Sequence, residues 1–91
     1  MIPSEINEVR WDPLKNKRLK QVRGASFEEI LDSKYLGIWN HPTKILQKVM
    51  LFEYKGYVWV VPFVRQGHEA FLKTLYASRK YTKLYERGEL I

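Results

Sequence analysis

The pattern of apolar and polar residues predicts strands in the second half of the chain. Residues 47–54 and 57–64 are both strand-like, and Lys55-Gly56 between them is typical of a two-residue hairpin turn. Residues 69–76 form a further predicted strand after a turn at 65–68. Because Pro62 cannot donate a hydrogen bond to a neighbouring strand, we expect a bulge there or a place beyond its neighbour's end.

The first half of the chain carries helix signals. Residues 4–11 alternate loosely and predict a short strand. Asp12-Pro13 then predicts a helix start, and Gly24 its end. Ser26-Phe27-Glu28-Glu29 has the form of a capping box and opens a second helix through Asp32. A short strand over 35–39 and a turn at 40–43 are weaker expectations.

The order of these elements predicts an α+β fold. Ser78 is a suitable N-cap for a last helix that ends near Arg87, before Gly88. Strands that follow one another along the chain favour an antiparallel sheet over a βαβ arrangement. We therefore expect one domain over residues 1–91, with an antiparallel sheet of about four strands. Two helices lie in its N-terminal half and one at its C-terminus, in the order β-α-α-β-β-β-α.

Charge narrows the class of partner. Sixteen Lys and Arg residues against ten Asp and Glu give a net charge of +6 and a pI of about 9.7, which suits a polyanion such as nucleic acid. The sequence has no cysteine, so disulfides and thiolate chemistry are excluded. It has no apolar run long enough for a membrane span and no secretion signal at its start. We expect a cytoplasmic protein without membrane contact.

The first basic cluster lies in the predicted helix after Trp11. On a helical wheel Leu14, Leu19 and Val22 share an arc with Trp11, and Lys15 and Arg18 fall inside this arc. One interpretation is that Arg18 points toward the sheet and holds a carboxylate or a phosphate. The alternative is a solvated basic face whose long side chains cover the edge of the core. The bases of residues 10–23 are Arg10, Lys15, Lys17, Arg18, Lys20 and Arg23, against Asp12 alone.

The second cluster joins the last strand to the last helix, over residues 71–81. Arg79 and Lys80 occupy the first turn of the helix, where the helix dipole disfavours cations. A bound anion would reverse this small penalty, because helix N-terminal amides and basic side chains bind phosphate together. The alternative is an ordinary exposed pair of bases. Strand alternation is expected to place Phe71, Lys73 and Leu75 on one face, and Leu72, Thr74 and Tyr76 on the other.

The loops contain fewer candidate site residues than the two basic clusters. Arg65 and His68 lie in the turn before residues 69–76, at the end of the hairpin away from Arg79, and we expect rim contacts there. His41 lies in a separate loop. Two separate histidines and no cysteine predict neither a metal site nor a bound cofactor.

Cutting RNA without a metal requires a base for the 2′-hydroxyl, cations for the phosphorane charge and an acid for the leaving 5′-oxygen. The second cluster has candidates for these roles. Lys73, Arg79 and Lys80 could stabilise charge, while Tyr76 or Tyr81 could donate a proton or stack on a base. Which residue fills each role stays open.

Two early segments and three later ones resemble the BrnT family of toxins. The resemblance covers about residues 8–87, and the Trp-Asp-Pro and Ser-Phe-Glu-Glu pair is its more specific part. The early segments are Trp11-Asp12-Pro13-Leu14-Lys15-Asn16 and Gly24-Ala25-Ser26-Phe27-Glu28-Glu29-Ile30. The later segments are Gly56-Tyr57-Val58-Trp59-Val60-Val61-Pro62-Phe63, Phe71-Leu72-Lys73-Thr74 and Ser78-Arg79-Lys80.

The resemblance implies a RelE-like fold and a ribonuclease that cleaves mRNA, free or on the ribosome. It also implies a cognate antitoxin that binds the toxin and represses their operon, so that operator DNA is contacted only through the antitoxin. Two segments depart from the family pattern: Val22-Arg23-Gly24 stands where Lys-His is often found, and Ala77-Ser78-Arg79-Lys80 is a reduced form of Ser-Ala-Arg-Arg. Arg79 is therefore the best-supported residue to carry over.

The sequence predicts one catalytic and RNA-binding site, and it leaves one alternative function open. The alternative is a non-catalytic basic module that binds nucleic acid or an acidic protein. An exposed edge strand could also pair two copies into a homodimer. The predicted catalytic residues are Lys73, Tyr76 and Arg79, and the predicted RNA-binding residues are Lys15, Arg18, Arg65, Lys80 and Tyr81.

Overall fold

The computed structural model describes residues 6–41 and 43–90. Residues 4 and 5 of the first predicted strand, and Pro42 of the predicted turn at 40–43, lie outside this part. The elements are β1 (Glu8–Arg10), α1 (Pro13–Arg23), α2 (Phe27–Leu31), β2 (Lys34–Asn40), β3 (Lys48–Tyr54), β4 (Tyr57–Gln66), β5 (Glu69–Leu72), β6 (Tyr76–Ser78) and α3 (Arg79–Glu86).

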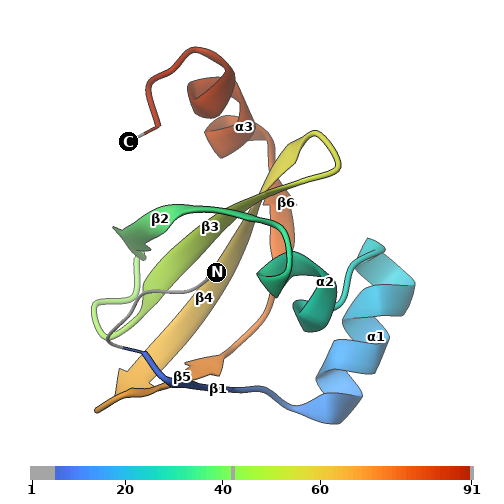
Figure 1. Cartoon of the computed structure of the whole chain (residues 1–91), viewed down its shortest axis with the longest axis vertical. Helices are drawn as coiled ribbons and strands as arrows, with labels where there is room; N and C mark the ends of the chain where they lie inside the picture. The colour runs from blue at the N-terminus through green and yellow to red at the C-terminus, as the bar shows by residue number, and fades with distance from the viewer. Residues whose placement is uncertain (1–5, 42, 91) are drawn as a thin grey trace.

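The strands form one mixed sheet in the order β1-β5-β4-β3-β2, and β6 pairs with β4 further along the edge that β5 uses (Figure 1). The α+β class is confirmed. The expected antiparallel sheet of about four strands was wrong, because the described chain forms six strands and β1 pairs with β5 in parallel. The difference arises because β2 is a full strand and the predicted strand 69–76 is divided in two.

That division is a bulge facing Pro62. Between the β4–β5 and β4–β6 ladders, residues 61 and 62 lie opposite residues 73–75, so the outer strand has one extra residue. The N–H of Lys73 donates to the carbonyl oxygen of Pro62 at 2.8 Å. Because the N and O atoms of a residue in an antiparallel strand point to the same side, the missing N–H of Pro62 also faces this irregular segment. The bulge expected at Pro62 is confirmed.

The bulge changes which side chains share a face. Leu72 and Leu75 are both buried in the same core, 1% and 0% exposed, while Phe71 and Lys73 are exposed. The expected placement of Leu75 beside Phe71 and Lys73 was therefore wrong. One extra residue reverses the alternation that follows it.

Local signals placed the helix ends and the hairpin correctly. The Asp12 side chain accepts from the N–H of Leu14 at 2.9 Å, and Gly24 closes α1 with φ of 82°. Ser26 and Glu29 form the expected capping box. In the hairpin turn the residues 55 and 56 both have positive φ, 50° and 83°, as a type I′ turn requires.

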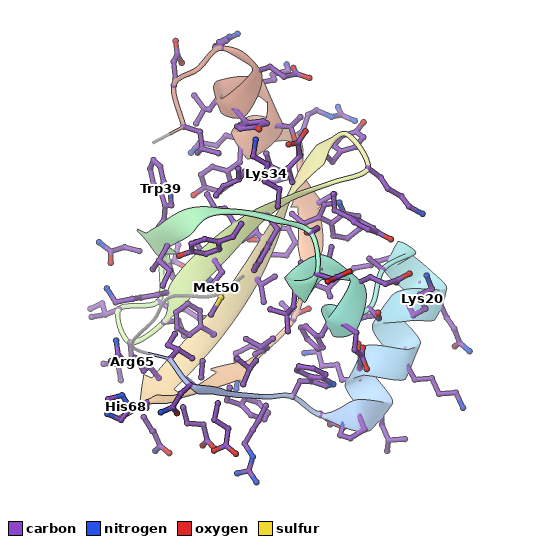
Figure 2. The ribbon with its side chains drawn as sticks, viewed as in Figure 1. Lys20, Lys34, Trp39, Met50, Arg65 and His68 are labelled. Carbon is purple, nitrogen blue, oxygen red and sulfur yellow. The ribbon has the colours of Figure 1, made fainter. Side chains whose placement is uncertain are left out.

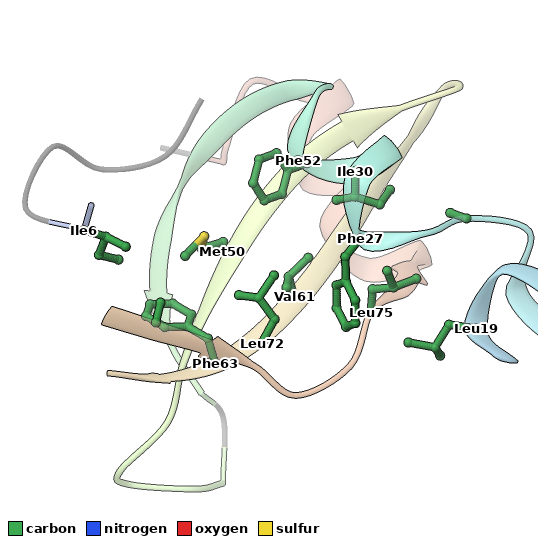
Figure 3. Packing of buried hydrophobic residues seen from close by; sticks show 12 residues of the cluster. Ile6, Leu19, Phe27, Ile30, Met50, Phe52, Val61, Phe63, Leu72 and Leu75 are labelled. Carbon is green, nitrogen blue, oxygen red and sulfur yellow. The ribbon is translucent and has the colours of Figure 1, made fainter. Parts of the chain in front are cut away.

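Apolar side chains cover both faces of the sheet. On one face Phe27 and Ile30 of α2 pack over buried residues that include Phe52 and Phe63 (Figure 3). On the other face α3 covers one end of the sheet, where a second apolar cluster forms (Figure 1). Its buried members are Val49, Leu51, Val58 and Val60, with Leu36, Trp39, Tyr76, Tyr81, Tyr85 and Leu90 packed against them.

Helix α1 does not lie flat on the sheet. It buries only Leu19, while Leu14 and Val22 are 79% and 69% exposed. Arg18 is exposed, so the interpretation in which it points toward the sheet was wrong, and its exposure agrees with the alternative of a solvated basic face. The helix lies beside the sheet next to α2, and its apolar arc therefore divides between core and solvent (Figure 1).

Polar contacts hold α1 against α2. The Asn16 side chain accepts from the N–H of Phe27 at 2.8 Å and donates to Glu28 Oε1 at 2.6 Å. Lys20 forms an ion pair with Glu29 at 2.8 Å. These contacts fix the position of a helix whose apolar burial is small.

Candidate functional site

The candidate residues follow one another along a single edge of β4. Lys73 lies in the bulge after β5, Tyr76 begins β6, and Arg79 begins α3. Leu72 and Ser78 pair with β4 residues five positions apart, which corresponds to about 17 Å at the usual rise of a strand. Lys73 and Arg79 therefore lie at two ends of an extended surface rather than at one point.

Tyr76 lies between these two ends. It pairs with Val60 and packs on the apolar face that α3 covers. Burial raises the pKa of the Tyr76 phenol, and the nearby Tyr81 adds to this, while the positive charge of Arg23 acts in the opposite direction. Tyr76 is therefore protonated at neutral pH and can donate a hydrogen bond or a proton.

The start of α3 is the most cationic part of this edge. Ser78 caps the helix by accepting from the N–H of Tyr81 at 3.1 Å. Arg79 and Lys80 follow as exposed residues, and the first turn contains no acidic residue. The first N–H groups of a helix and these two cations together form a geometry that suits an anion such as phosphate.

Aromatic rings lie next to this helix start. Lys80 Nζ is 5.9 Å from the centre of the Tyr81 ring, and that ring is 6.1 Å from the ring of Trp39 on β2. Sequence reasoning did not select Trp39, because only the fold brings the edge strand β2 close to α3. Half-buried rings of this kind can stack on nucleic-acid bases.

Lys73 occupies a different setting. It is exposed, and its Nζ lies 5.5 Å from the centre of the Phe71 ring, so its side chain extends back along β5 rather than toward α3. This cation–π contact is weak at an exposed position, about 0.5–1 kcal/mol, so the ammonium group can move to another partner.

Two contacts fix α3 on the sheet. The buried Thr82 hydroxyl accepts from the N–H of Val58 at 2.8 Å and donates to the carbonyl of Ser78 at 2.6 Å. The Tyr85 hydroxyl donates to Glu53 at 2.9 Å and accepts from Lys34 at 3.1 Å (Lys34 is labelled in Figure 2). These contacts hold α3, and with it the backbone of Arg79 and Lys80, against the sheet.

Arg23 is a further residue near the candidate site that sequence reasoning did not select. Its guanidinium donates to the carbonyl oxygen of Leu75 at 2.6 Å, directly before Tyr76. In the sequence Arg23 is one of several bases in a helix, and only the packing of α1 against the bulge distinguishes it.

The remaining predicted RNA-binding residues lie elsewhere. Lys15 and Arg18 are on α1, which lies apart from α3 (Figure 1). Arg65 and His68 lie at the β4–β5 turn, at the end of the sheet away from α3 (Figure 2). Arg65 Nε donates to the carbonyl of Gly67 at 2.7 Å. The structure thus places Tyr76 near Tyr81 and Lys80 close to the Tyr81 ring, with Arg79 at the start of the same helix, and leaves Lys15, Arg18 and Arg65 on other surfaces.

The described residues contain no group of three or more His, Cys, Asp or Glu side chains placed to hold a metal ion. Within 6–41 and 43–90 there is also no enclosed pocket, so a ligand at the start of α3 would bind to an open surface. In the same part of the chain, no helix is long and apolar enough to cross a membrane.

Comparison with known proteins gives one informative likeness. No protein-family model matches the chain, and no curated protein sequence does. The solved structure of the Brucella abortus ribonuclease toxin BrnT is similar, with a TM-score of 0.53 and 20% sequence identity over 78% of this chain and 95% of that one. At this identity the likeness concerns the fold alone: the chain has a mixed α+β fold similar to that of BrnT.

Proposed function

We propose that this chain is the toxin of a toxin–antitoxin pair and acts as an endoribonuclease that cleaves mRNA without a metal. One observation carries the proposal: Arg79 and Lys80 begin a helix without an acidic first turn, three and four residues after Tyr76, whose phenol is protonated. The fold is similar to that of a protein described as a ribonuclease toxin, which supports the same conclusion. The RelE-like classification remains a prediction.

In this proposal Arg79 stabilises the negative charge that develops on the phosphate during attack by the 2′-hydroxyl. Tyr76 donates a proton to the leaving 5′-oxygen as the 2′-oxygen closes the cyclic phosphate. The proton of the 2′-hydroxyl passes to water, and the Tyr76 phenolate regains its proton from water. Lys73 supplies a second cation further along the strand edge, where it meets an adjoining part of the RNA. Lys80 and Tyr81 bind the RNA next to the cleaved bond, Lys80 by its charge and Tyr81 by stacking.

The biological setting follows from the same proposal. RNA is the substrate, and cleavage of mRNA inhibits translation in the cytoplasm. A cognate antitoxin neutralises the single toxin domain and brings it to operator DNA. We place the pairing of two copies into a homodimer at the outer edge of β2, the last strand of the sheet.

The test uses the purified chain, a single-stranded RNA and two variants. Removing one group that stabilises transition-state charge costs about a hundredfold or more in rate, so Arg79→Ala should lose most of the cleavage. Arg87→Ala removes an exposed cation at the other end of α3 and should cleave normally. If wild type binds RNA but never cleaves it, the chain is instead a non-catalytic binding module.

Growth measurements in cells give an independent test. Expression of the wild-type chain should arrest growth, and Arg79→Ala and Lys73→Ala should relieve the arrest while circular dichroism shows an unchanged fold. Full toxicity in both variants would contradict the assignment of these residues.

A further inference from the structure

The outer face of α1 has a stripe of two exposed apolar side chains with a cation between them, and the stripe makes no contact with the core. We propose that it docks an acidic, amphipathic helix of a partner protein. The stripe consists of Leu14, Arg18 and Val22, which are spaced by four residues and therefore lie in line along one side of the helix.

The exposure of this stripe is unusual for a helix in a small domain. A surface helix normally turns its apolar side to the core, but α1 turns only Leu19 inward. The stripe is centred about 100° around the helix from Leu19, at 3.6 residues per turn. Leu14 and Val22 are 79% and 69% exposed, so their burial by a partner would remove apolar surface from water.

The charge around the stripe indicates the chemistry of the partner. Residues 13–23 contain no carboxylate. Lys20 forms an ion pair with Glu29, and Arg23 donates a hydrogen bond to the carbonyl oxygen of Leu75. Lys17 and Arg18, in contrast, form no ion pair with any residue that the structure describes. A partner helix with apolar residues on one side would cover Leu14 and Val22, and Glu or Asp beside these residues would pair with the cations of α1.

Two other occupants fit less well. A second copy bound about a two-fold axis would bring the two Arg18 guanidiniums together at the centre of the stripe, which is repulsive. An RNA strand would use Arg18 but would leave Leu14 and Val22 without apolar partners, and α1 itself has no aromatic ring for stacking. An acidic helix avoids both problems.

This surface lies apart from the start of α3, so a partner on α1 need not compete directly with RNA (Figure 1). If the partner is the neutralising antitoxin, that identification rests on the proposed function. The docking surface itself does not, because it follows from the exposure and charge of α1 alone.

The test is a nuclear magnetic resonance titration of the full chain with three probes. The first is a synthetic capped helix with Leu along one side and Glu beside it, the second is its counterpart with Lys in place of Glu, and the third is a single-stranded RNA. The acidic helix should shift the backbone amide signals of residues 14–22, and the basic helix should not. Arg18→Glu should weaken binding of the acidic helix by on the order of tenfold or more.

A matched control uses a different exposed apolar residue. Ile45 is 96% exposed in the loop between β2 and β3, and Ile45→Ser should leave binding unchanged, whereas Val22→Ser should weaken it. The proposal is overturned if neither helix binds, if both bind equally, if only RNA shifts the α1 signals, or if these signals move on dilution without a probe. RNA cleavage, measured separately, distinguishes failure of the docking surface from failure of the proposed function.

Discussion

The guanidinium of Arg23 donates to the backbone carbonyl of Leu75 at 2.6 Å and so joins the end of α1 to the segment before β6. The same guanidinium donates to the Thr74 hydroxyl at 3.2 Å. Both acceptors belong to the bulge, which leads directly into Tyr76. The basic helix is thus connected to the candidate site by one side chain, although its other outward bases are not.

Removing this connection should cost stability. A hydrogen bond from a charged group contributes about 1.5 kcal/mol or more, so Arg23→Met should lower the free energy of unfolding by roughly that amount. Urea unfolding measures the change. Arg18→Met, on the exposed side of the same helix, is the matched control and should behave like wild type; equal effects of the two variants would show that the contact with Leu75 is unimportant.

Thr82 should be more sensitive than its small size suggests. Its hydroxyl accepts from the N–H of Val58, and Thr82→Val leaves this buried donor without an acceptor. The expected loss is about 1–3 kcal/mol in urea unfolding. Thr43→Val changes an exposed loop position and should have little effect. An unaltered stability of Thr82→Val would mean that α3 is not held by this contact.

Acid should weaken the contact between α1 and α2. The hydrogen bond and charge of Lys20, together with the N–H of Ser26, lower the pKa of Glu29 from 4.5 to about 2. A carboxyl whose pKa is lowered by folding contributes stability above its unfolded value, and this contribution is lost as pH falls from about 4.5 to about 2. Thermal unfolding across this range should show a smaller loss for Glu29→Gln than for wild type. Glu86→Gln is the control, and an identical pH dependence of all three proteins would contradict the prediction.

Tyr76→Phe separates proton donation from packing. The ring keeps its place on the sheet beside Val60, while the hydroxyl is lost, so stability should change little and RNA cleavage should fall by about a hundredfold. Because burial raises the pKa of Tyr76 above its ordinary value of 10.0, wild-type activity should not decline through loss of this proton until pH exceeds 10. Cleavage rates measured against pH test this. Normal cleavage by Tyr76→Phe would rule out the assignment, and a decline near neutrality that Tyr76→Phe abolishes would contradict the raised pKa.

Much of the fold was predictable because its signals are local. The Asp12 and Ser26 caps, the turn at 55–56 and the irregularity at Pro62 each follow from the chemistry of a few neighbouring residues. The parallel pairing of β1 with β5 was not predictable in this way, because it depends on where a long intervening chain returns.

The candidate site was predictable to a similar extent. The Ser78 cap places Arg79 and Lys80 at a helix start from sequence alone. The closeness of Trp39 to Tyr81, and of Arg23 to Leu75, depends on tertiary packing. Such packing cannot be recognised from the residues that flank Trp39 and Arg23 in the sequence. The orientation of α1 was not predictable for a related reason. A helical wheel identifies an apolar arc but does not say whether the core or a partner covers it.

Analysis of the RNA ends after incubation with the purified chain in EDTA tests the central claim most directly. Attack by the 2′-hydroxyl without a metal should continue in EDTA and leave a 2′,3′-cyclic phosphate and a 5′-hydroxyl, and DNA of the same sequence should stay intact. RNA that remains whole with and without EDTA, or cleavage that EDTA abolishes, would contradict the account.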